Sequence, residues 1–436
     1  MDSYSETLDK IYHLRGGEID LRLDRMNQAV ALFDHPEKRF PSIHIAGTNG
    51  KGSTAAMLHR ILSLAGYRTA LYTSPHLVSF TERIRVGDEE IRPNEVVEIA
   101  EEIEKRTASA GIGLTFFEFI TVLAFVYFAR QRVKIAVIEV GLGGRLDATN
   151  LITPLVSVIT TISKDHEAYL GSDLLSIARE KGGIIKPSVP VVCGAVSGEV
   201  RELLKKIAAD NRSPAYFLSS GYSFFLKDEG LFDYTGMTER LPNLSLALRG
   251  RHQRANAAAA LAALELASRN FPVSEQAIRE GLKTVSWPGR FELVGENPTI
   301  LLDGAHNGEG VKALAQAIQE FRKGESVKFL FASMADKDWR LMLDTLVPVA
   351  REFVLTRVDM DRSADPRDLA AYLGQRVPFQ LAPDARAGLD ALLRGADPSD
   401  TLVVAGSLYL LGEIRPLLVK ADPSKAAATK AAFPQS

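Results

Sequence analysis

A glycine-rich turn near the start of the chain carries the residue types best suited to bind phosphate. It reads GTNGKGST and directly follows the apolar run 42–46. Glycines let the backbone turn tightly so that N–H groups converge on phosphate oxygens, and the N-terminus of a following helix adds partial positive charge. Lys51 supplies a point charge for terminal phosphates. The predicted phosphate site consists of Gly47, Thr48, Asn49, Gly50, Lys51, Gly52, Ser53 and Thr54.

This loop departs from the standard nucleoside-triphosphate loop in two places. The standard pattern has Gly six residues before the Lys and Ser or Thr directly after it, whereas this sequence has Ile45 and Gly52 there. The hydroxyl is displaced to Ser53, so we expect a hydroxyl ligand for Mg²⁺ to come from another segment. Ser74, in the segment TSPHL, offers one, although a proline turn would explain the same residues.

Two further segments carry metal-ligand residue types where predicted strands end. Glu139 ends the apolar run 134–140, and the segment SKDH after the run 155–161 contains Asp165 and His166. Ligands of open α/β sheets bind at the carboxyl ends of strands, where Glu139 would hold Mg²⁺ and Asp165 would orient His166. A charge at a strand end is common, and a single His is more often structural, so these residues alone leave both interpretations open.

A lysine near the end of a predicted helix has two interpretations. Lys181 lies in the segment AREKGGI, just before two glycines. A positive charge is favourable at a helix C-terminus. Taken alone, the pattern therefore favours a helix end over a functional lysine.

Composition excludes several functional classes. The net charge of −2 gives no electrostatic argument for nucleic acid. The most apolar helix candidate, residues 116–129, is too short to span a bilayer and carries Glu118. The single cysteine, Cys193, cannot form an internal disulfide, and the acidic, polar N-terminus has no signal-peptide pattern. We therefore expect a cytoplasmic protein that binds small molecules, with neither nucleic acid nor a membrane as partner, and that is a monomer.

Short apolar, β-branched runs that alternate with helical periodicity predict an α/β fold with mostly parallel strands. In the first part of the chain the expected strands are residues 42–46, 69–73, 134–140, 155–161 and 189–192. The expected helices are residues 53–64, 94–108, 116–130 and 256–267. Short alternating runs over residues 215–249 indicate a small antiparallel patch.

A second α/β series follows. Its expected strands are residues 299–302, 328–332, 352–356 and 402–405, and its expected helices are residues 310–320, 365–373 and 408–418. We predict an ATP-binding domain over residues 1–295, a Rossmann-like C-terminal domain over residues 296–422, and a frayed tail over residues 423–436.

Eleven stretches together resemble the family of folylpolyglutamate synthases and dihydrofolate synthases, which are relatives of the Mur cell-wall ligases. They run in family order from about residue 43 to residue 413, which is nearly the whole chain. The stretches are HIAGTNGKGST, TSPHL, TFFEF, EVGLGGRLDATN, KDH, EKGGIIKP, RHQRANA, WPGRFE, DGAHN, DKDW and GSLYLLGE. The resemblance implies a P-loop ATPase-like domain followed by a Rossmann-like domain.

The resemblance also implies roles for individual residues. Lys51 and its loop would hold the ATP phosphates, and Ser74, Glu139 and His166 would ligate two Mg²⁺ ions. Lys181 matches a lysine that is carbamylated in the family. Further implied positions are Asn256 and Arg290 for ATP, Asp303 and His306 in a loop that closes the site, Arg145 and Asp147 for the pterin or its carboxylate, and Ser407 and Tyr409 for glutamate.

Two residues depart from the family pattern. Gly308 stands where Pro usually follows DGAHN, so we expect a more mobile loop there. Gly182 replaces an Ala after Lys181, and we expect little effect.

The aromatic group Phe116, Phe117 and Phe119 offers flat surface for a pterin. A helix shows only one face to a cleft, so at least two of these rings are expected in the core.

The implied reaction is ATP-dependent ligation of L-glutamate to dihydropteroate and to reduced folates through an acyl phosphate. A folylpolyglutamate synthase without the dihydropteroate reaction is one alternative. A Mur-type peptidoglycan ligase is another, but the loop starts at Gly47, which we expect to leave no room for a UDP-sugar-binding domain. A non-catalytic ATP-binding scaffold is disfavoured because Glu139, His166, Asp303 and His306 are all present.

Overall fold

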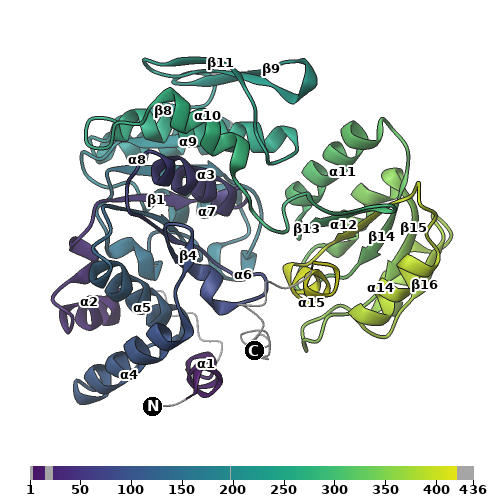
Figure 1. The fold of residues 1–436 in the computed structure, drawn as a ribbon, viewed down its shortest axis with the longest axis horizontal. Helices are drawn as coiled ribbons and strands as arrows, with labels where there is room; N and C mark the ends of the chain where they lie inside the picture. Colours follow the sequence, from purple (N-terminus) through teal and green to yellow (C-terminus); the bar gives the residue numbers. More distant parts are fainter. Residues whose placement is uncertain (1–2, 15–22, 197, 420–436) are drawn as a thin grey trace.

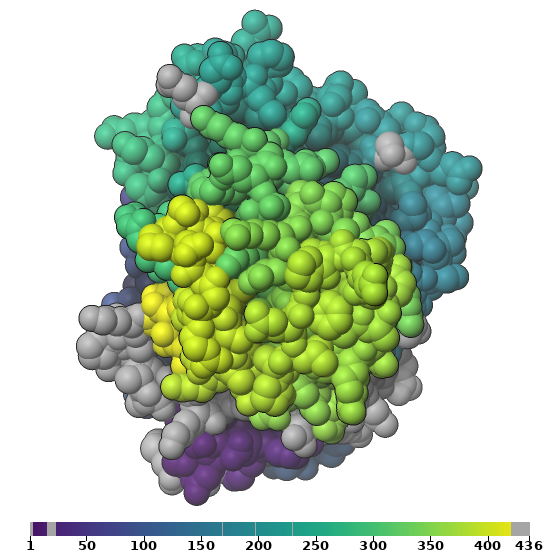
Figure 2. Space-filling model, turned by 90° about the vertical axis from the view of Figure 1, so that its right-hand side faces the viewer, coloured from purple at the N-terminus to yellow at the C-terminus, as the bar shows by residue number. Residues whose placement is uncertain are grey.

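The computed structural model describes residues 3–14, 23–196 and 198–419. Its elements form two units that lie side by side, the first on the left of Figure 1 and the second, green to yellow, on the right. Figure 2 looks onto the second unit, with the first behind it. None of the described helices is both long and apolar enough to cross a membrane.

The first unit is built on an eight-stranded sheet with the order β4-β3-β2-β5-β1-β6-β7-β8. Its central strands are parallel, whereas β3 and β4 pair antiparallel at one edge. The bounds are β1 Ser42–Ala46, β2 Thr69–Tyr72, β3 Ile84–Val86, β4 Glu89–Glu90, β5 Ile135–Glu139, β6 Val156–Thr161, β7 Val191–Ala195 and β8 Ala215–Phe217. All five residues of β1 and of β5 are buried, which explains their continuous apolar runs.

Helices cover both faces of this sheet. The helices α3 (Lys51–Leu64), α9 (Arg251–Ala267) and α10 (Glu275–Thr284) share one core with Ile43 and Ile45 of β1. The opposite face packs against α1 (Tyr4–Tyr12), α2 (Asp24–Ala31), α4 (Pro93–Ser109), α5 (Phe116–Arg130), α7 (Leu174–Gly182) and α8 (Gly198–Asp210). The short helix α6 (Glu167–Leu170) and the 3-10 helices η1 (Pro36–Lys38), η2 (Phe80–Arg83), η3 (Ala148–Leu151) and η4 (Asp228–Gly230) lie in connections.

A small antiparallel sheet, β11-β10-β9, packs onto the α9 side and lies at the top of Figure 1. Its strands are β9 Ser223–Leu226, β10 Phe232–Thr235 and β11 Arg240–Leu244. The predicted patch over residues 215–249 therefore contains this sheet, but β8, at its start, pairs parallel with β7 in the large sheet.

The second unit has a six-stranded sheet with the order β12-β13-β17-β14-β15-β16, parallel except for β12. Its strands are β12 Glu292–Glu296, β13 Thr299–Asp303, β14 Val327–Phe331, β15 Ala350–Leu355, β16 Phe379–Leu381 and β17 Thr401–Ala405. The helices α11 (Gly308–Arg322), α12 (Trp339–Leu346) and α13 (Pro366–Leu373) cover one face, with η5 (Val347–Val349) beside them. The other face packs against α14 (Ala385–Arg394) and α15 (Leu408–Leu418).

The predicted fold class, two α/β units with mostly parallel sheets and a small antiparallel patch, is confirmed. The predicted boundary at 295/296 falls at the end of β12, a strand paired with β13 in the second sheet. We therefore infer that the second unit begins before Glu292. The predicted tail, residues 423–436, lies outside the described residues.

Candidate active site

The phosphate loop joins β1 to α3 at the centre of the large sheet, between β5 and β6. Gly50 caps α3 with φ of 88°, a left-handed conformation that favours glycine. A Cβ atom on Gly50 would lie 2.4 Å from Asn256 Oδ1, so the α9 residue Asn256 closes against the loop. At Gly52 a Cβ atom would lie 2.9 Å from the Trp287 ring. The indole of Trp287 thus occupies the space that the standard Ser or Thr side chain needs.

Hydrogen bonds from β6 hold the loop in place. Thr48 N donates to Thr161 O at 2.8 Å, and Asn49 N donates to Thr161 Oγ1 at 3.0 Å. Thr160 Oγ1 in turn donates to Asn49 O at 2.7 Å. These bonds fix the backbone at Thr48 and Asn49 before any ligand binds.

Lys51 and Glu139 face each other across the loop. The Lys51 Nζ lies 4.0 Å from Glu139 Oε1, and Ser74 N donates to Glu139 Oε2 at 3.3 Å. Burial raises the pKa of Glu139 to about 7, although Lys51 opposes the shift. A buried carboxylate in this state gains from a further cation. The predicted neighbours Ser74 and Glu139 are therefore together in the structure.

Lys181 reaches the same loop from α7. Its side chain is buried, and its Nζ donates to Gly47 O at 2.9 Å rather than to the end of its own helix. Burial lowers the pKa of Lys181 to about 7, and the nearby charge of Lys51 adds to the effect. This geometry favours the functional interpretation over a simple helix end.

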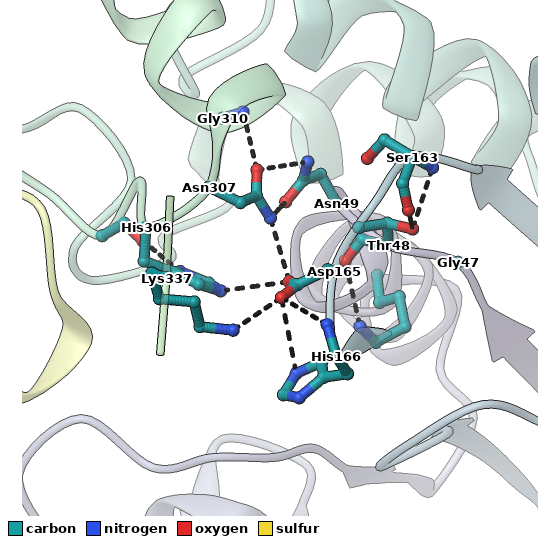
Figure 3. A network of polar contacts seen from close by, with 12 residues as sticks. Gly47, Thr48, Asn49, Ser163, Asp165, His166, His306, Asn307, Gly310 and Lys337 are labelled. Carbon is teal, nitrogen blue, oxygen red and sulfur yellow. Dashed lines mark hydrogen bonds and ion pairs between the residues drawn. The ribbon is translucent and has the colours of Figure 1, made fainter. Parts of the chain in front are cut away.

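A second cluster joins the two units around Asp165, as Figure 3 shows. Lys337 Nζ donates to Asp165 Oδ1 at 2.5 Å, and Asn307 Nδ2 donates to Asp165 Oδ2 at 3.0 Å. His306 Nε2 lies 3.8 Å from Asp165 Oδ2, and His166 Nε2 lies 3.9 Å from Asp165 Oδ1. Burial alone would raise the pKa of Asp165, but its charged and polar neighbours, Lys337 among them, lower it. Burial lowers the pKa of His166 to about 4 and also lowers the pKa of His306, so both imidazoles are neutral at neutral pH. Asp165 is therefore an anion paired with Lys337 of the second unit and flanked by one neutral imidazole from each unit.

An amide pair ties the phosphate loop to the second unit. Asn307 Nδ2 donates to Asn49 Oδ1 at 3.1 Å, and Asn49 Nδ2 donates to Asn307 Oδ1 at the same distance. Asn307 Oδ1 also accepts from Gly310 N at 2.9 Å, which caps α11. The start of α11 and the phosphate loop thus share one side chain (Figure 3).

Three predicted site residues use their side chains to shape loops. The buried Asp147 accepts from Leu142 N at 2.8 Å and Thr149 N at 3.0 Å. Asp303 accepts from Phe291 N and Ala305 N, both at 2.9 Å. Ser407 Oγ accepts from Tyr409 N at 3.1 Å and caps α15. Their carboxylate and hydroxyl oxygens are largely occupied by backbone N–H groups.

Two predicted arginines occupy different surroundings. Arg145, an exposed side chain, pairs with Glu180 at 2.8 Å. Arg290 lies against the DGAHN loop, because a Cβ atom on Gly304 would be 2.4 Å from Arg290 Nη1. Arg290 is therefore placed between the two units, whereas Arg145 lies beside α7.

The aromatic group at the start of α5 divides as a helix face requires. Phe119 is fully buried, whereas Phe116 and Phe117 are half-buried. Phe116 stacks on Tyr12 with ring centroids 5.4 Å apart and an interplanar angle of 25°. The ring of Phe117 lies against Gly141, where a Cβ atom would be 2.3 Å away. One ring belongs to the core, and two partly buried rings line its edge, so the expectation of at least two core rings is wrong.

Sequence reasoning missed Asn307, Lys337 and Trp287 as site residues. All three lie in stretches that carried the family resemblance, DGAHN, DKDW and WPGRFE. Their partners Asn49, Asp165 and Gly52 lie far away along the chain, so no local spacing could have paired them.

The residues of the site fit a magnesium ion that is bound partly by the protein and partly by the phosphates of a substrate. Among the described residues no group of three or more His, Cys, Asp and Glu side chains is close enough to hold a metal. Mg²⁺ is usually bound by one or two carboxylates together with substrate phosphates and water, so such a group is not required. The buried Glu139, beside Ser74 and the phosphate loop, provides a suitable oxygen donor.

Two family models match the chain. The Mur ligase middle domain matches residues 45–264, and the Mur ligase, glutamate ligase domain matches residues 289–408. A dihydrofolate synthase/folylpolyglutamate synthase of Bacillus subtilis is 34% identical over 90% of this chain and 94% of its own. The Escherichia coli protein of the same name is 34% identical over 93% of both chains.

Solved structures are similar over the same extent. E. coli FolC in complex with DHPP and ADP has a TM-score of 0.89 at 32% identity, covering 95% of this chain and 97% of that chain. The bifunctional folylpolyglutamate synthase/dihydrofolate synthase of Yersinia pestis, complexed with AMPPNP and Mn, has a TM-score of 0.87 at 31% identity, covering 96% and 98%. The similarity therefore includes both units and their junction.

Proposed function

The chain belongs to the Mur ligase family and, within it, to the dihydrofolate synthase/folylpolyglutamate synthases, and on this premise we propose that it joins L-glutamate to dihydropteroate and to the glutamate chain of reduced folates. It is an ATP-dependent ligase. The observation that supports the proposal most is the cluster around Asp165, where the second unit contacts the phosphate loop of the first.

In the first step the carboxylate of the acceptor attacks the γ-phosphate of ATP and gives an acyl phosphate and ADP. The Lys51 ammonium and the loop N–H groups hold the phosphates, while Asn256 and Arg290 hold the rest of the nucleotide. Two Mg²⁺ ions, held by Ser74, Glu139 and His166, would neutralise phosphate charge when bound. Catalysis of this step is then mostly positioning and charge stabilisation.

Lys181 is carbamylated in the active enzyme under this proposal. Its pKa of about 7 leaves a substantial neutral fraction at neutral pH, and only the neutral amine attacks CO₂. The new N–C bond forms as one amine proton is released, so a buried cation beside Lys51 becomes an anion. That change removes a repulsion and adds oxygen atoms next to the phosphate loop.

In the second step the amine of L-glutamate attacks the acyl phosphate, and phosphate leaves through a tetrahedral intermediate. Glutamate binds between the units, near His306 and the Ser407–Tyr409 segment, with Asp303 shaping the loop that carries His306. Arg145 and Asp147 belong to the loop that meets the acceptor. Closure of the two units excludes water, which would otherwise hydrolyse the acyl phosphate.

Phosphate release with ATP and L-glutamate, measured with dihydropteroate and with tetrahydrofolate in turn, tests the function. We expect release and a glutamylated product, seen by mass spectrometry, with both acceptors. Product from tetrahydrofolate alone would leave a folylpolyglutamate synthase, and product from neither would contradict the proposal.

The proposal includes an ATP-binding unit that ends before Glu292, a glutamate-binding unit after it, and a cytoplasmic monomer. Light scattering at assay concentration tests the oligomeric state. A dimer mass that persists on dilution would contradict the monomer.

A further inference from the structure

Arg83, at the end of η2, is a buried cation without an anionic partner among the residues that the structure describes. Its side chain is only 5% exposed. Within the described part of the chain its one hydrogen bond runs from Nε to His76 Nδ1, at 2.7 Å, and it forms no ion pair. His76 Nδ1 accepts this bond through its lone pair, so it brings no negative charge to the guanidinium. The remaining donors of the guanidinium have no partner among the described residues.

The acidic residue beside Arg83 does not supply the missing anion. Glu82 accepts hydrogen bonds from the backbone N–H groups of Leu77, Val78 and Ser79, at 2.7 to 2.9 Å. Its two oxygens are used to hold that turn. Arginine stays protonated at any ordinary pH, so the charge remains. A buried and unpaired charge is costly, and such a site is stabilised when a ligand brings the opposite charge.

The surroundings of Arg83 indicate what kind of anion fits. The guanidinium carbon lies 5.5 Å from the ring centroid of Phe116, which itself stacks on Tyr12. An anion bound to Arg83 therefore has flat aromatic surface next to it. A carboxylate attached to an aromatic body, as in an aminobenzoyl-glutamate, matches both features.

Arg83 lies near the reacting centre without belonging to it. Its hydrogen-bond partner His76 is two residues along the chain from Ser74, whose N–H donates to Glu139. Lys51 lies 4.0 Å from Glu139, whereas no ion pair joins Arg83 to Glu139 among the described residues. The reacting carboxylate has to meet the phosphate that Lys51 holds, so Arg83 is available for a second carboxylate on the same molecule.

We propose that Arg83 binds the α-carboxylate of the terminal glutamate of a folate acceptor, and so determines specificity for that acceptor over dihydropteroate. This inference rests on the proposed function. Dihydropteroate has only its reacting carboxylate, so it has no group for Arg83. A folate acceptor has both an α- and a γ-carboxylate, and the pairing of the first with Arg83 leaves the second free to react.

The test compares Arg83→Met with the unmodified enzyme on three acceptors: tetrahydrofolate, dihydropteroate, and a tetrahydropteroyl conjugate of 4-aminobutyrate, which lacks the α-carboxylate. With tetrahydrofolate, we expect the variant to lose kcat/KM on the order of 10- to 100-fold, mainly through KM, as a lost charged hydrogen bond predicts. With the other two acceptors we expect changes below about 3-fold. Arg83→Lys should recover part of the loss with tetrahydrofolate.

Arg85 provides the matched control. It lies two residues along the chain and is paired with Glu90 at 3.1 Å, so Arg85→Met should not change acceptor preference. Equal losses on all three acceptors, or no loss on any, would overturn the assignment of Arg83. Lack of activity of the unmodified enzyme on every acceptor would instead contradict the proposed function. Thermal unfolding of Arg83→Met, expected at or above the temperature of the unmodified protein, excludes misfolding as the cause.

Discussion

Buried charged side chains are weakly paired at one edge of the first sheet and fully paired at one edge of the second. At the carboxyl ends of the first sheet's strands, Glu139 lies 4.0 Å from Lys51. Lys181 reaches this edge from α7, and its one side-chain hydrogen bond to a described residue is to the backbone carbonyl of Gly47. At the amino ends of β14, β15 and β17 in the second sheet, Lys328 Nζ lies 3.0 Å from Asp400, which also pairs with Arg351 at 3.0 Å. Burial alone would raise the pKa of the Asp400 carboxyl. The hydrogen bond from Asp397 N and the bond and charge of Lys328 outweigh burial, so this pKa lies below its ordinary value.

The difference separates stability from binding. The second-sheet cluster satisfies its own charges, so it needs nothing from solution. The first-sheet edge leaves charges under-compensated, and under the proposed function phosphate, Mg²⁺ and carboxylate are the groups that compensate them. Buried charge alone does not mark a functional site, but buried charge that lacks a partner in the folded chain does.

The largest expected effect is that of Lys51→Ala. Loss of the ammonium removes charge stabilisation from the phosphates, so turnover should fall on the order of 10²- to 10³-fold or more. Because Lys51 lies at the loop and outside the core clusters, the fold should remain intact. Phosphate release and circular dichroism measure the two expectations. A folded variant with near-normal turnover would remove the phosphate-loop assignment.

Glu139→Gln should reduce activity at ordinary Mg²⁺ on the order of 10²-fold, because a neutral amide is a poor ligand for a hard cation. Mg²⁺ titration of phosphate release measures it. Full activity at ordinary Mg²⁺ would make Glu139 no more than a charge at a strand end.

The unfolding temperature of Glu139→Gln, compared with that of the unmodified protein, should depend on pH. Burial raises the folded pKa of Glu139 to about 7, so its contribution to stability is present below the unfolded value and is lost as pH rises through 7. Without ligands, Glu139→Gln should therefore gain in unfolding temperature relative to the unmodified protein between pH 5 and pH 8. A difference that stays constant or falls would contradict a Glu139 carboxyl whose folded pKa is raised by burial.

Removal of CO₂, which would reverse the carbamylation of Lys181, should have a smaller and reversible effect on activity. We expect activity to fall several-fold when CO₂ is removed and to return with bicarbonate. Because the amine has a pKa of about 7, the loss should deepen as pH falls below 7, where the amine is protonated. High-resolution density that shows an unmodified ammonium, together with full activity after CO₂ removal, would refute the carbamate.

The sequence predicted the central elements well because their patterns are local and strong. The runs that became β1, α5 and α15 have the predicted bounds, since continuous burial or a full helical turn pattern defines them. The short edge strands β3, β4, β12 and β16 were not predicted, because two to five residues with mixed exposure carry little periodic signal.

The site residues also divide into those that local sequence patterns locate and those whose contacts form only in the folded chain. Lys51, Ser74 and Glu139 were predicted because strand ends and glycine turns locate them along the chain. The bonds of Asp165 to Lys337 and Asn307 arise only when the two units pack together. The likewise unpredicted role of Asp147 as a loop support depends on backbone N–H groups whose direction no residue pattern shows.

The smallest expected effect on catalysis is that of Lys328→Met, which moves the comparison to the second sheet. The variant keeps the volume of the side chain but removes the cation between Asp400 and Glu352, which lies 3.6 Å from Lys328. Asp400 keeps Arg351 and the N–H of Asp397, so we expect a loss of about 1–3 kcal/mol in the free energy of unfolding. Activity per folded molecule should stay unchanged, because the cluster lies at the opposite ends of the strands from the loop that carries His306. Urea unfolding and phosphate release on the same preparation measure both quantities.

Lys328→Met is thus the reverse of Arg83→Met, which should lose activity with a folate acceptor while keeping or gaining stability. If Lys328→Met lost turnover without losing stability, the separation between paired charges that stabilise and unpaired charges that bind would fail.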